Sequence, residues 1–417
     1  MNFWKYLRIL AVGIILGFLL LSVVYMLPVA PMKANTSRDL EIIEKEGAYP
    51  NLIEGVKSTQ LDNFTDTVML SLAVYDGDEP AYVKAVSGNH YDDKNVADIP
   101  ELKEYLRDDK RGEVVSYAWY WHGYLVIIKP LLMLTGVKGI RRISMVVSAA
   151  LILIIVAMLV KKRQIGFVVP YLMAVTVINP MVVPMSMQYG TAWYTMQLFL
   201  LFLILAEIDD PVKLSMAFFA AGMAVEYFDL LTYPLVVYGI PATYMVYSID
   251  RKTGFVSVIK EIFTTGISFI AGYGLMLASK LILVLAFVNP GVVEDAKNHI
   301  FLRLSGEGMD TDIRRIDAVT RNLEVLNTEF YYIAAAVAVA AIIAVAMLLR
   351  KKKGKKAITP LKIIPYMIIA LTPFAWYFVL ANHSHIHYFF TYRNLAVTAC
   401  ALGAGVLGIF GAGYKER

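Results

Sequence analysis

The chain has 417 residues, of which 58% are hydrophobic and only 18% are charged, and its mean hydropathy is +0.58. This composition excludes a water-soluble domain and predicts a helical protein that crosses the membrane several times. The net charge of +5 is not a nucleic-acid signal, because Lys and Arg collect at the ends of apolar runs, and the single cysteine, Cys400, excludes an intramolecular disulfide.

Apolar runs and basic clusters together predict the topology. Lys and Arg cluster at 161–163, 251–252, 350–356 and 415–417. With ten spans, all four clusters and both termini lie on the cytoplasmic side, as the positive-inside rule requires. The sequence therefore predicts an all-α polytopic protein of the plasma membrane with about ten transmembrane helices. The runs lie near 7–28, 140–160, 166–186, 190–206, 213–232, 234–249, 260–288, 331–349, 361–381 and 394–413.

These spans divide the chain into five parts. Residues 1–28 form a first transmembrane helix, which we interpret as retained rather than as a cleaved signal peptide. Residues 29–139 form a large extracytoplasmic loop that carries juxtamembrane helices. Residues 140–288 form spans two to seven, 289–330 form another extracytoplasmic loop, and 331–417 form the last three spans with a cytoplasmic C-terminus.

One further apolar stretch, residues 117–134, is long enough to be mistaken for a span. If it crossed the membrane, the cluster at 161–163 would face outward and every later cluster would be inverted. The stretch also begins with aromatic residues and contains His122 and Lys129. We therefore expect an interfacial or re-entrant helix on the extracytoplasmic side.

Two acids in the first loop are candidates for catalysis. They lie in the segment Asp62-Asn63-Phe64-Thr65-Asp66, and a helix through it would place both carboxylates on one face. Asp66 would act as a general base that accepts a proton from an acceptor hydroxyl, with Asp62 as the alternative base. The simpler explanation is that Asp62 caps a helix and Asp66 is solvated.

A second pair of acids, Glu226 and Asp229, lies at the outer end of a hydrophobic run. Acids at such positions usually face a cavity or a partner, so both are candidates for substrate binding. The alternative is an interfacial pair satisfied by Tyr227 or a nearby arginine. The preceding external link adds Gln188 and Tyr189 as neutral hydrogen-bonding groups.

The external link 382–393 contains His383, His385, His387, Tyr392 and Arg393. In an extended chain the alternating histidines would share a face and could ligate a metal, so a divalent metal ion is the cofactor that the sequence leaves open. The favoured hypothesis is that the histidines and Arg393 bind phosphate, because a guanidinium offers a forked set of donors. The alternative is an aromatic interface belt in which Arg393 reaches toward headgroups.

Three further residues are candidates for substrate binding. Arg303 lies in the 289–330 loop and could meet a lipid phosphate, although most arginines there fit a solvated face. His122 and Tyr124 belong to the aromatic segment Tyr120-Trp121-His122-Gly123-Tyr124, where a structural role at the membrane interface is the alternative.

This layout resembles the GT-C superfamily of integral-membrane glycosyltransferases, particularly its protein-mannosyltransferase and aminoarabinose-transferase branch. In that branch a first span leads to an external loop with an acidic motif, then to a juxtamembrane aromatic helix, a Gly and an Arg that opens the next span. The counterparts here are the segment 62–66, His122-Gly123-Tyr124, Gly136 and Arg141-Arg142. The resemblance covers residues 1–165 by pattern and the rest by span count. The chain departs from it because its two acids are not adjacent and the two prolines that follow the histidine in the family motif are missing after His122.

The resemblance implies that a sugar is transferred, with inversion, from a polyprenyl-phosphate donor to an extracytoplasmic glycan, lipid or protein. Asp66 would be the base, Arg393 and a histidine would stabilise the departing phosphate, and Glu226 or Asp229 would orient the sugar or the acceptor. The expected partners are the donor, the acceptor and membrane lipids, and no nucleic acid. The alternative function is a multi-spanning transporter or a flippase for lipids or glycolipids, in which buried acids would line a path.

Overall fold

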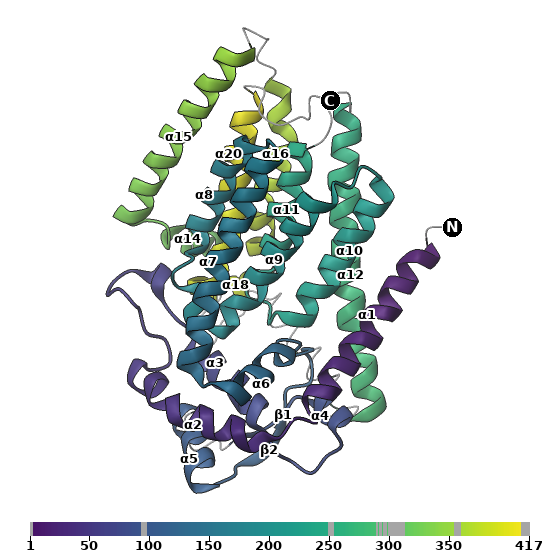
Figure 1. Cartoon of the computed structure of the whole chain (residues 1–417), viewed down its shortest axis with the longest axis vertical. Helices are drawn as coiled ribbons and strands as arrows, with labels where there is room; N and C mark the ends of the chain where they lie inside the picture. The colour runs from purple at the N-terminus through teal and green to yellow at the C-terminus, as the bar shows by residue number, and fades with distance from the viewer. Residues whose placement is uncertain are drawn as a thin grey trace.

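The structure is a computed structural model that describes residues 3–92, 98–248, 254–288, 313–353 and 360–409, together with positions 291, 294 and 298. Most of the described chain is helical, with one small sheet, so the predicted all-α class is confirmed. Long helices form a bundle, and a smaller polar unit (residues 29–134) lies at one end of it (Figure 1).

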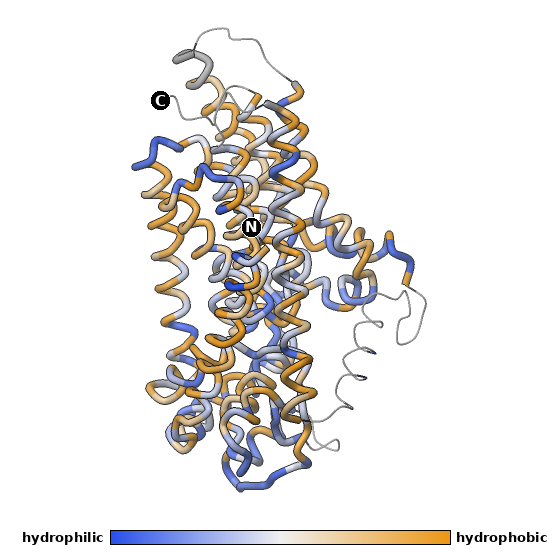
Figure 2. The backbone as a smooth tube through the Cα atoms, turned by 90° about the vertical axis from the view of Figure 1, so that its right-hand side faces the viewer, coloured by the Kyte–Doolittle hydropathy of each residue, from blue (hydrophilic) through white to orange (hydrophobic). Residues whose placement is uncertain are grey.

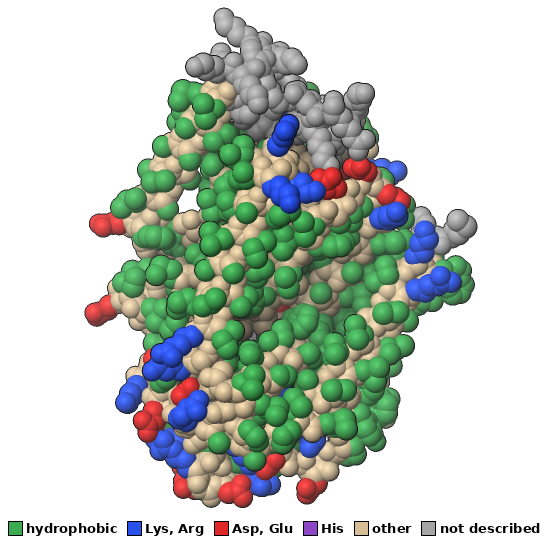
Figure 3. All heavy atoms as spheres, in the orientation of Figure 1, with side chains coloured by type: hydrophobic (Ala, Val, Ile, Leu, Met, Phe, Trp, Pro, Cys, Tyr) green, Lys and Arg blue, Asp and Glu red, His purple; other side chains and the backbone are tan. Residues whose placement is uncertain are grey.

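Seven segments in the described residues are long and apolar enough to cross a membrane. This agrees with a membrane-embedded protein, and apolar side chains cover most of the face in Figure 3, with charged residues gathered toward its two ends. The segments are α1 (Phe3–Val24), α7 (Val137–Lys161), α9 (Met187–Ala206), α12 (Phe255–Phe287), most of α15 (Glu329–Lys353), and the runs Leu361–Val379 and Tyr388–Ile409.

Three helices that the predicted ten spans would need do not meet this criterion. They are α8 (Val168–Ile178), α10 (Pro211–Phe228) and α11 (Leu235–Ser248). At 1.5 Å per residue, α8 and α11 are about 16 and 21 Å long, short of the roughly 30 Å of hydrocarbon. Helix α8 ends because Asn179 adopts a left-handed conformation immediately before Pro180, so the run predicted at 166–186 is broken. The count of ten spans stays a prediction.

The last two apolar runs are also broken into shorter helices. The first contains a 3-10 turn (Pro360–Ile363), α16 (Ile364–Ala370) and α17 (Thr372–Val379), whose N-terminal turns carry Pro365 and Pro373. The second contains α19 (Tyr388–Thr391), a 3-10 turn (Tyr392–Asn394) and α20 (Leu395–Ile409). Between them lies α18 (Ala381–Ile386), and α14 (Arg315–Glu324) packs beside it.

Helices α10 and α12 pack with their backbones in direct contact, which anchors the side of the bundle next to α1. A Cβ atom at Gly222 would lie 2.1 Å from the carbonyl oxygen of Phe269, and one at Gly272 would lie 2.0 Å from that of Phe219. Small residues at a helix crossing allow this approach, as is common in membrane proteins. A larger residue at either glycine would force the two helices apart.

The polar unit wraps short helices around a two-stranded antiparallel sheet, with Asn89 opposite Ser116 and Asp92 opposite Glu113. It carries much of the hydrophilic chain of the molecule (Figure 2). The elements are α2 (Val29–Glu46), a 3-10 turn (Lys57–Thr59), α3 (Asn63–Val74), α4 (Ala81–Ser87), β1 (Asn89–Asp92), α5 (Asp98–Asp108), β2 (Glu113–Ser116) and α6 (Leu125–Leu134).

The apolar stretch 117–134 folds as a turn followed by α6. Helix α6 has ten residues and is therefore about 15 Å long, half of what a span requires. It packs against α2 and α1 within the polar unit. The length of α6 agrees with the prediction that this stretch does not cross the membrane.

Helix α12 joins the bundle to the polar unit. Its 33 residues extend over about 50 Å, more than the hydrocarbon thickness. Near its C-terminal end, Lys280 is completely buried and donates a 2.6 Å hydrogen bond from Nζ to the carbonyl oxygen of Val86 in α4. One turn earlier, the indole of Trp121 donates to the carbonyl oxygen of Met276 at 2.9 Å. These bonds fix the polar unit against the bundle.

Candidate functional site

The first acidic motif lies at the start of α3. The carboxylate of Asp62 accepts hydrogen bonds from the backbone N–H of Thr65 at 2.9 Å and from its hydroxyl at 2.8 Å, which makes Asp62 the N-cap of α3. Burial raises the pKa of Asp62 to about 7, although both bonds from Thr65 favour the ionised form. Asp62 is therefore a helix cap with a pKa close to neutrality, where a carboxyl group can both take up and release a proton.

Asp66 connects α3 to the first turn of α9. It is buried, with 1% of its surface exposed, so the expectation that it is solvated is wrong. Its oxygens accept from the hydroxyl of Ser186 and from the backbone N–H groups of Met187 and Gln188, each at 3.0 Å. Burial raises the pKa of Asp66 to about 6, while these donors and the charge of Arg141 favour the ionised form. The carboxylate thus caps α9 from a neighbouring helix, and both of its oxygens accept hydrogen bonds there.

A buried ion pair holds the same motif from the other side. The guanidinium of Arg141, on α7, donates to the two carboxylate oxygens of Glu46 at 2.7 and 2.8 Å and to Oδ1 of Asn63 at 3.1 Å. The amide of Asn63 in turn donates to Glu46 at 3.0 Å and to the carbonyl oxygen of Gly47 at 2.8 Å. Helices α2, α3 and α7 therefore meet at one network beside Asp62.

Gly136, another part of the resemblance, stands where α7 passes close to α2. A Cβ atom there would lie 2.4 Å from both the carbonyl oxygen of Asn35 and the carboxylate of Asp39. The same carboxylate accepts from the backbone N–H of Lys138 at 3.0 Å, in the first turn of α7. A side chain at Gly136 would separate these two helices.

His122 and Tyr124 bond to each other in the turn before α6. The Nε2 atom of His122 lies 2.6 Å from the carbonyl oxygen of Tyr117, and Nδ1 lies 2.9 Å from the hydroxyl of Tyr124. Because a carbonyl can only accept, Nε2 carries the proton and Nδ1 accepts from Tyr124. Burial and the charge of Lys280 lower the pKa of His122 to about 3, so the ring is neutral. Both side chains are buried and hold this turn in place.

The acids Glu226 and Asp229 are buried at the end of α10. Asp229 accepts from the hydroxyl of Thr191 at 2.6 Å and from the backbone N–H and hydroxyl of Thr232, the N–H at 2.8 Å. Glu226 acts electrostatically on Tyr273 of α12. Thr191 and Thr232 therefore satisfy Asp229, in place of the Tyr227 or arginine that the sequence suggested.

The three histidines of the link 382–393 do not line one face, because the link is helical rather than extended. In a helix, side chains two residues apart point in nearly opposite directions, so the expected alternating metal site is wrong. His383 and His387 lie one turn apart with ring centroids at 4.9 Å, and Nε2 of His383 bonds the carbonyl oxygen of Leu231 at 2.8 Å. His385 lies away from this pair, beside α14, where Asp317 and Arg321 act on its charge.

Arg393 is completely buried rather than extended toward headgroups. It donates from Nε to the carbonyl oxygen of Ile178 and from Nη1 to that of Phe389, both at 3.0 Å. Its guanidinium carbon lies 4.1 Å from the ring centroid of Tyr189 and 4.9 Å from that of Tyr392, in cation–π contact. Within the described part of the chain, Nη2 has no hydrogen-bond partner.

The two tyrosines around Arg393 support the segment that leads to Asp62. Tyr189 donates its hydroxyl to the carbonyl oxygen of Gln60 at 2.9 Å, and Tyr392 donates to that of Ser58 at 3.2 Å. Arg393, Tyr189 and Tyr392 therefore lie near the first acidic motif. The two tyrosine hydroxyls contact the backbone of the segment that precedes this motif. Arg303, the remaining predicted residue, lies outside the described residues.

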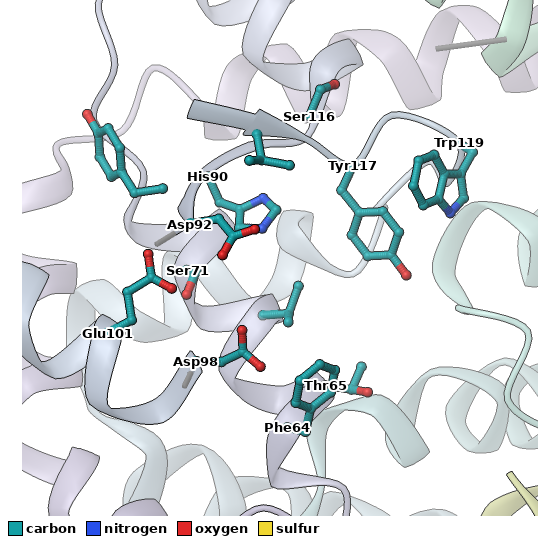
Figure 4. A pocket seen from close by; sticks show the side chains of 13 residues that line it. Phe64, Thr65, Ser71, His90, Asp92, Asp98, Glu101, Ser116, Tyr117 and Trp119 are labelled. Carbon is teal, nitrogen blue, oxygen red and sulfur yellow. The ribbon is translucent and has the colours of Figure 1, made fainter. Parts of the chain in front are cut away.

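A cavity of about 270 Å³ opens in the polar unit beside α3 (Figure 4). This volume is close to the lower limit of typical ligand pockets, roughly 300 Å³. Residues of α3, β1, α5 and β2, and the chain just after β2, form its wall. The lining residues are Phe64, Thr65, Val68, Ser71, His90, Tyr91, Asp92, Asp98, Glu101, Val115, Ser116, Tyr117 and Trp119.

Three of these lining residues are acids. Asp92, Asp98 and Glu101 each place a carboxylate oxygen within 4.8 Å of the others. Burial and the charge of Asp92 raise the pKa of Asp98. Carboxylate oxygens are hard ligands of the kind that Mg²⁺, Mn²⁺ and Ca²⁺ prefer, so the donor set is compatible with the divalent cation that the sequence left open. Carboxylates also accept hydrogen bonds from sugar hydroxyls.

Asp62 lies next to this cavity. The hydroxyl of Thr65, which lines the cavity, donates to Asp62 at 2.8 Å. The ring of Tyr49 stacks on Phe64 of the cavity wall at 6.1 Å between centroids. Burial, then the charges of Asp62 and Asp98, raise the pKa of Tyr49, so its hydroxyl is within electrostatic reach of both acids. Thr65 therefore connects Asp62 to the wall of the cavity.

The cavity acids were not among the residues that we singled out from the sequence. Between His90 and Glu101 the chain carries five residues of the types His, Asp and Glu, namely His90, Asp92, Asp93, Asp98 and Glu101. That density was the available signal, but an acidic loop segment is most often a solvated surface. Only the pairing of β1 with β2 and the packing of α5 on α3 turn it into a cavity wall.

No protein-family model, curated protein or solved structure matches this chain.

Proposed function

We propose that the protein is a membrane glycosyltransferase that transfers a sugar from a polyprenyl-phosphate donor to an acceptor bound in the cavity of the polar unit. One observation carries this proposal. Asp62, a carboxyl group whose pKa burial raises to about 7, lies directly behind an acid-rich cavity on a membrane-embedded helical bundle. The layout of its motifs resembles that of GT-C glycosyltransferases.

In the proposed reaction, Asp62 rather than Asp66 takes the proton. The oxygens of Asp66 are occupied by three donors from α9, and moving it would uncap that helix. The carboxylate of Asp62 bonds only to Thr65 among the described residues, and Thr65 lines the cavity. Rotation of the Thr65 hydroxyl would release one carboxylate oxygen of Asp62 toward an acceptor hydroxyl.

This step accounts for every proton and electron pair and needs no further reagent. The acceptor oxygen loses its proton to Asp62 and attacks the anomeric carbon, while the bond from that carbon to the phosphate oxygen breaks. The sugar is transferred with inversion, and the polyprenyl phosphate leaves with the electron pair. Asp92, Asp98 and Glu101 would bind sugar hydroxyls or hold a divalent cation that offsets the phosphate charge.

The other predicted residues receive supporting roles in this proposal. Arg393 packs against Tyr189 and Tyr392, and the hydroxyls of these two tyrosines hold the backbone of the segment before Asp62. Asp66, Glu46 and Arg141 fix α3 against α9, α2 and α7. These groups would position the base and would not themselves contact the sugar.

The test is release of polyprenyl phosphate by the purified protein from a panel of polyprenyl-phosphate sugars, with and without added Mn²⁺ or Mg²⁺. The informative variant is Asp62→Asn, because asparagine caps helices as well as aspartate but cannot accept the proton. Loss of a general base should lower turnover by about 10²–10⁴. The matched control is Asp210→Asn, the same change at the cap of α10, which should keep full activity.

Each outcome separates a different part of the proposal. An active wild type with a fully active Asp62→Asn variant would show that another group is the base. No release from any donor, combined with movement of lipid-linked sugar across a reconstituted vesicle membrane, would support the flippase alternative instead.

A further inference from the structure

A second hollow, unrelated to the cavity of the polar unit, lies along helix α1 in the membrane-embedded part. It is a groove of about 470 Å³ between α1 and α10, with Met276 of α12 at its floor. The α1 wall includes Val12 and Leu16, which are 63% and 53% exposed, so the groove opens on the outer surface of the bundle. Its other members are Arg8, Ile9, Gly13, Gly17, Leu20, Ala220, Met223, Ala224, Tyr227 and Phe228.

The walls of this groove are fixed at both ends. The hydroxyl of Tyr6 lies 2.7 Å from that of Ser215, and the hydroxyl of Tyr227 donates to the carbonyl oxygen of Gly17 at 2.8 Å. These two pairs show that α1 and α10 run parallel. Between them, a Cβ atom at Gly13 would lie 2.3 Å from the terminal methyl group of Met223. The helices therefore touch along the floor and cannot close further over the groove.

The charge of the groove is confined to one end. Arg8 is the only charged residue in its wall, and all the others are apolar or aromatic. Lys5 lies one turn before Arg8 on α1. No carboxylate of the described residues lies within ion-pairing distance of Arg8. An anion at this end would therefore meet uncompensated positive charge.

The length of the groove matches one leaflet of a bilayer. From Arg8 to Leu20 is twelve residues, or roughly 18 Å along the helix. Half of the hydrocarbon thickness is about 15 Å. A lipid whose phosphate meets Arg8 would therefore have an acyl chain that reaches the Leu20 end of the groove.

We propose that this groove holds one anionic glycerophospholipid, with its phosphate at Arg8 and one acyl chain between α1 and α10. The apolar wall accounts for the chain, and the unpaired guanidinium accounts for the preference for a negative headgroup. The proposal is independent of the glycosyltransferase activity.

Native mass spectrometry of the protein, released from micelles with added phosphatidylglycerol or phosphatidylcholine, tests the proposal. The wild type should keep one phosphatidylglycerol under conditions that strip all phosphatidylcholine. Arg8→Gln should lower the preference for the anionic lipid by about fivefold, the contribution of one basic residue near an anionic headgroup. Lys5→Gln is the matched control, since Lys5 does not line the groove, and should change the preference much less.

A second pair of variants tests the chain-binding part. Ala220→Phe fills the groove without changing charge and should abolish retention of the single lipid. Leu19→Phe adds an aromatic ring on the exposed face of α1 outside the groove and should leave it intact. A thermal melt of each variant checks that α1 stays docked, and Val12→Trp fills the groove from the other wall if Ala220→Phe does not fold.

Three results would overturn the proposal. Equal effects of Arg8→Gln and Lys5→Gln would mean general attraction to a charged surface. Full retention in both Ala220→Phe and Val12→Trp would mean that no chain lies in the groove. Displacement of phosphatidylglycerol by an equimolar polyprenyl phosphate would assign the groove to a different lipid.

Discussion

The buried ion pair of Arg141 and Glu46 should be the main interaction that positions Asp62, the proposed base. Arg141→Met removes both charged donors from Glu46 and one donor from Asn63, the first residue of α3. Breaking a fully buried ion pair costs about 3–5 kcal/mol. Water reaches Glu46, whose side chain is 24% exposed against 7% for Arg141, so we expect a loss of about 2–4 kcal/mol.

The assay is a double-mutant cycle. Unfolding free energies of the wild type, Arg141→Met, Glu46→Leu and the double variant would be measured by titrating micelles with SDS. Two directly bonded residues should be coupled by about 2 kcal/mol. Arg141→Lys should recover only part of the loss, because a lysine cannot form the two parallel bonds.

The coupling energy from the double-mutant cycle can also contradict this prediction. A coupling energy below about 0.5 kcal/mol would mean that the two residues act independently and that the network does not hold α3. Turnover provides a second readout. If Arg141→Met loses stability but keeps the wild-type pH profile of turnover, the ion pair of Arg141 with Glu46 does not position Asp62.

Further predictions concern pH, topology and the second motif. Turnover should rise with pH through about 7, because Asp62 must be ionised to accept a proton, and Asp62→Asn should lack this limb. Because folding raises the pKa of Asp62, the contribution of this residue to stability is complete below about pH 4 and is lost as the pH rises through 7. Over this pH range the unfolding free energy of Asp62→Asn should therefore fall less than that of the wild type. In intact cells, a membrane-impermeant thiol reagent should label Asp109→Cys but not Lys161→Cys, and labelling of the latter from outside would overturn the predicted orientation. Tyr124→Phe should cost about 1 kcal/mol of stability, because Nδ1 of His122 loses its donor, and an unchanged unfolding midpoint would contradict the assigned tautomer.

Several features of the fold follow directly from the order of residues. Long apolar runs bounded by basic clusters specify membrane-embedded helices, because unpaired backbone groups and charges are too costly in hydrocarbon for any other local structure. The same reasoning separated residues 117–134 from the spans, and the ten-residue α6 agrees with that choice. The breaks near Pro180, Pro184 and Pro234 are also local, since proline and a left-handed Asn179 disfavour continuation of a helix, although Pro130 and Pro241 lie inside α6 and α11 without ending them.

The roles of the polar residues could not be read in the same way. Asp62 and Asp66 differ by four positions in one motif, yet one caps its own helix and the other caps α9, which begins more than a hundred residues later. Arg393 has the composition of a phosphate ligand, but three tyrosines and two carbonyl groups enclose it. The sequence identifies groups whose burial costs free energy, but tertiary packing determines which partner groups offset this cost.

The sequence by itself determined the class of this protein, the position of its polar unit and the residues that must be either satisfied or used. Only the tertiary structure decided which of them border a cavity. Asp92, Asp98 and Glu101 come together because β1 pairs with β2 and α5 packs on α3, and neither contact is encoded within a single local segment. Helix and span formation depend on neighbours within a few residues, whereas a site depends on side chains that meet across long loops. That difference in range is why the fold class was predictable and the site was not.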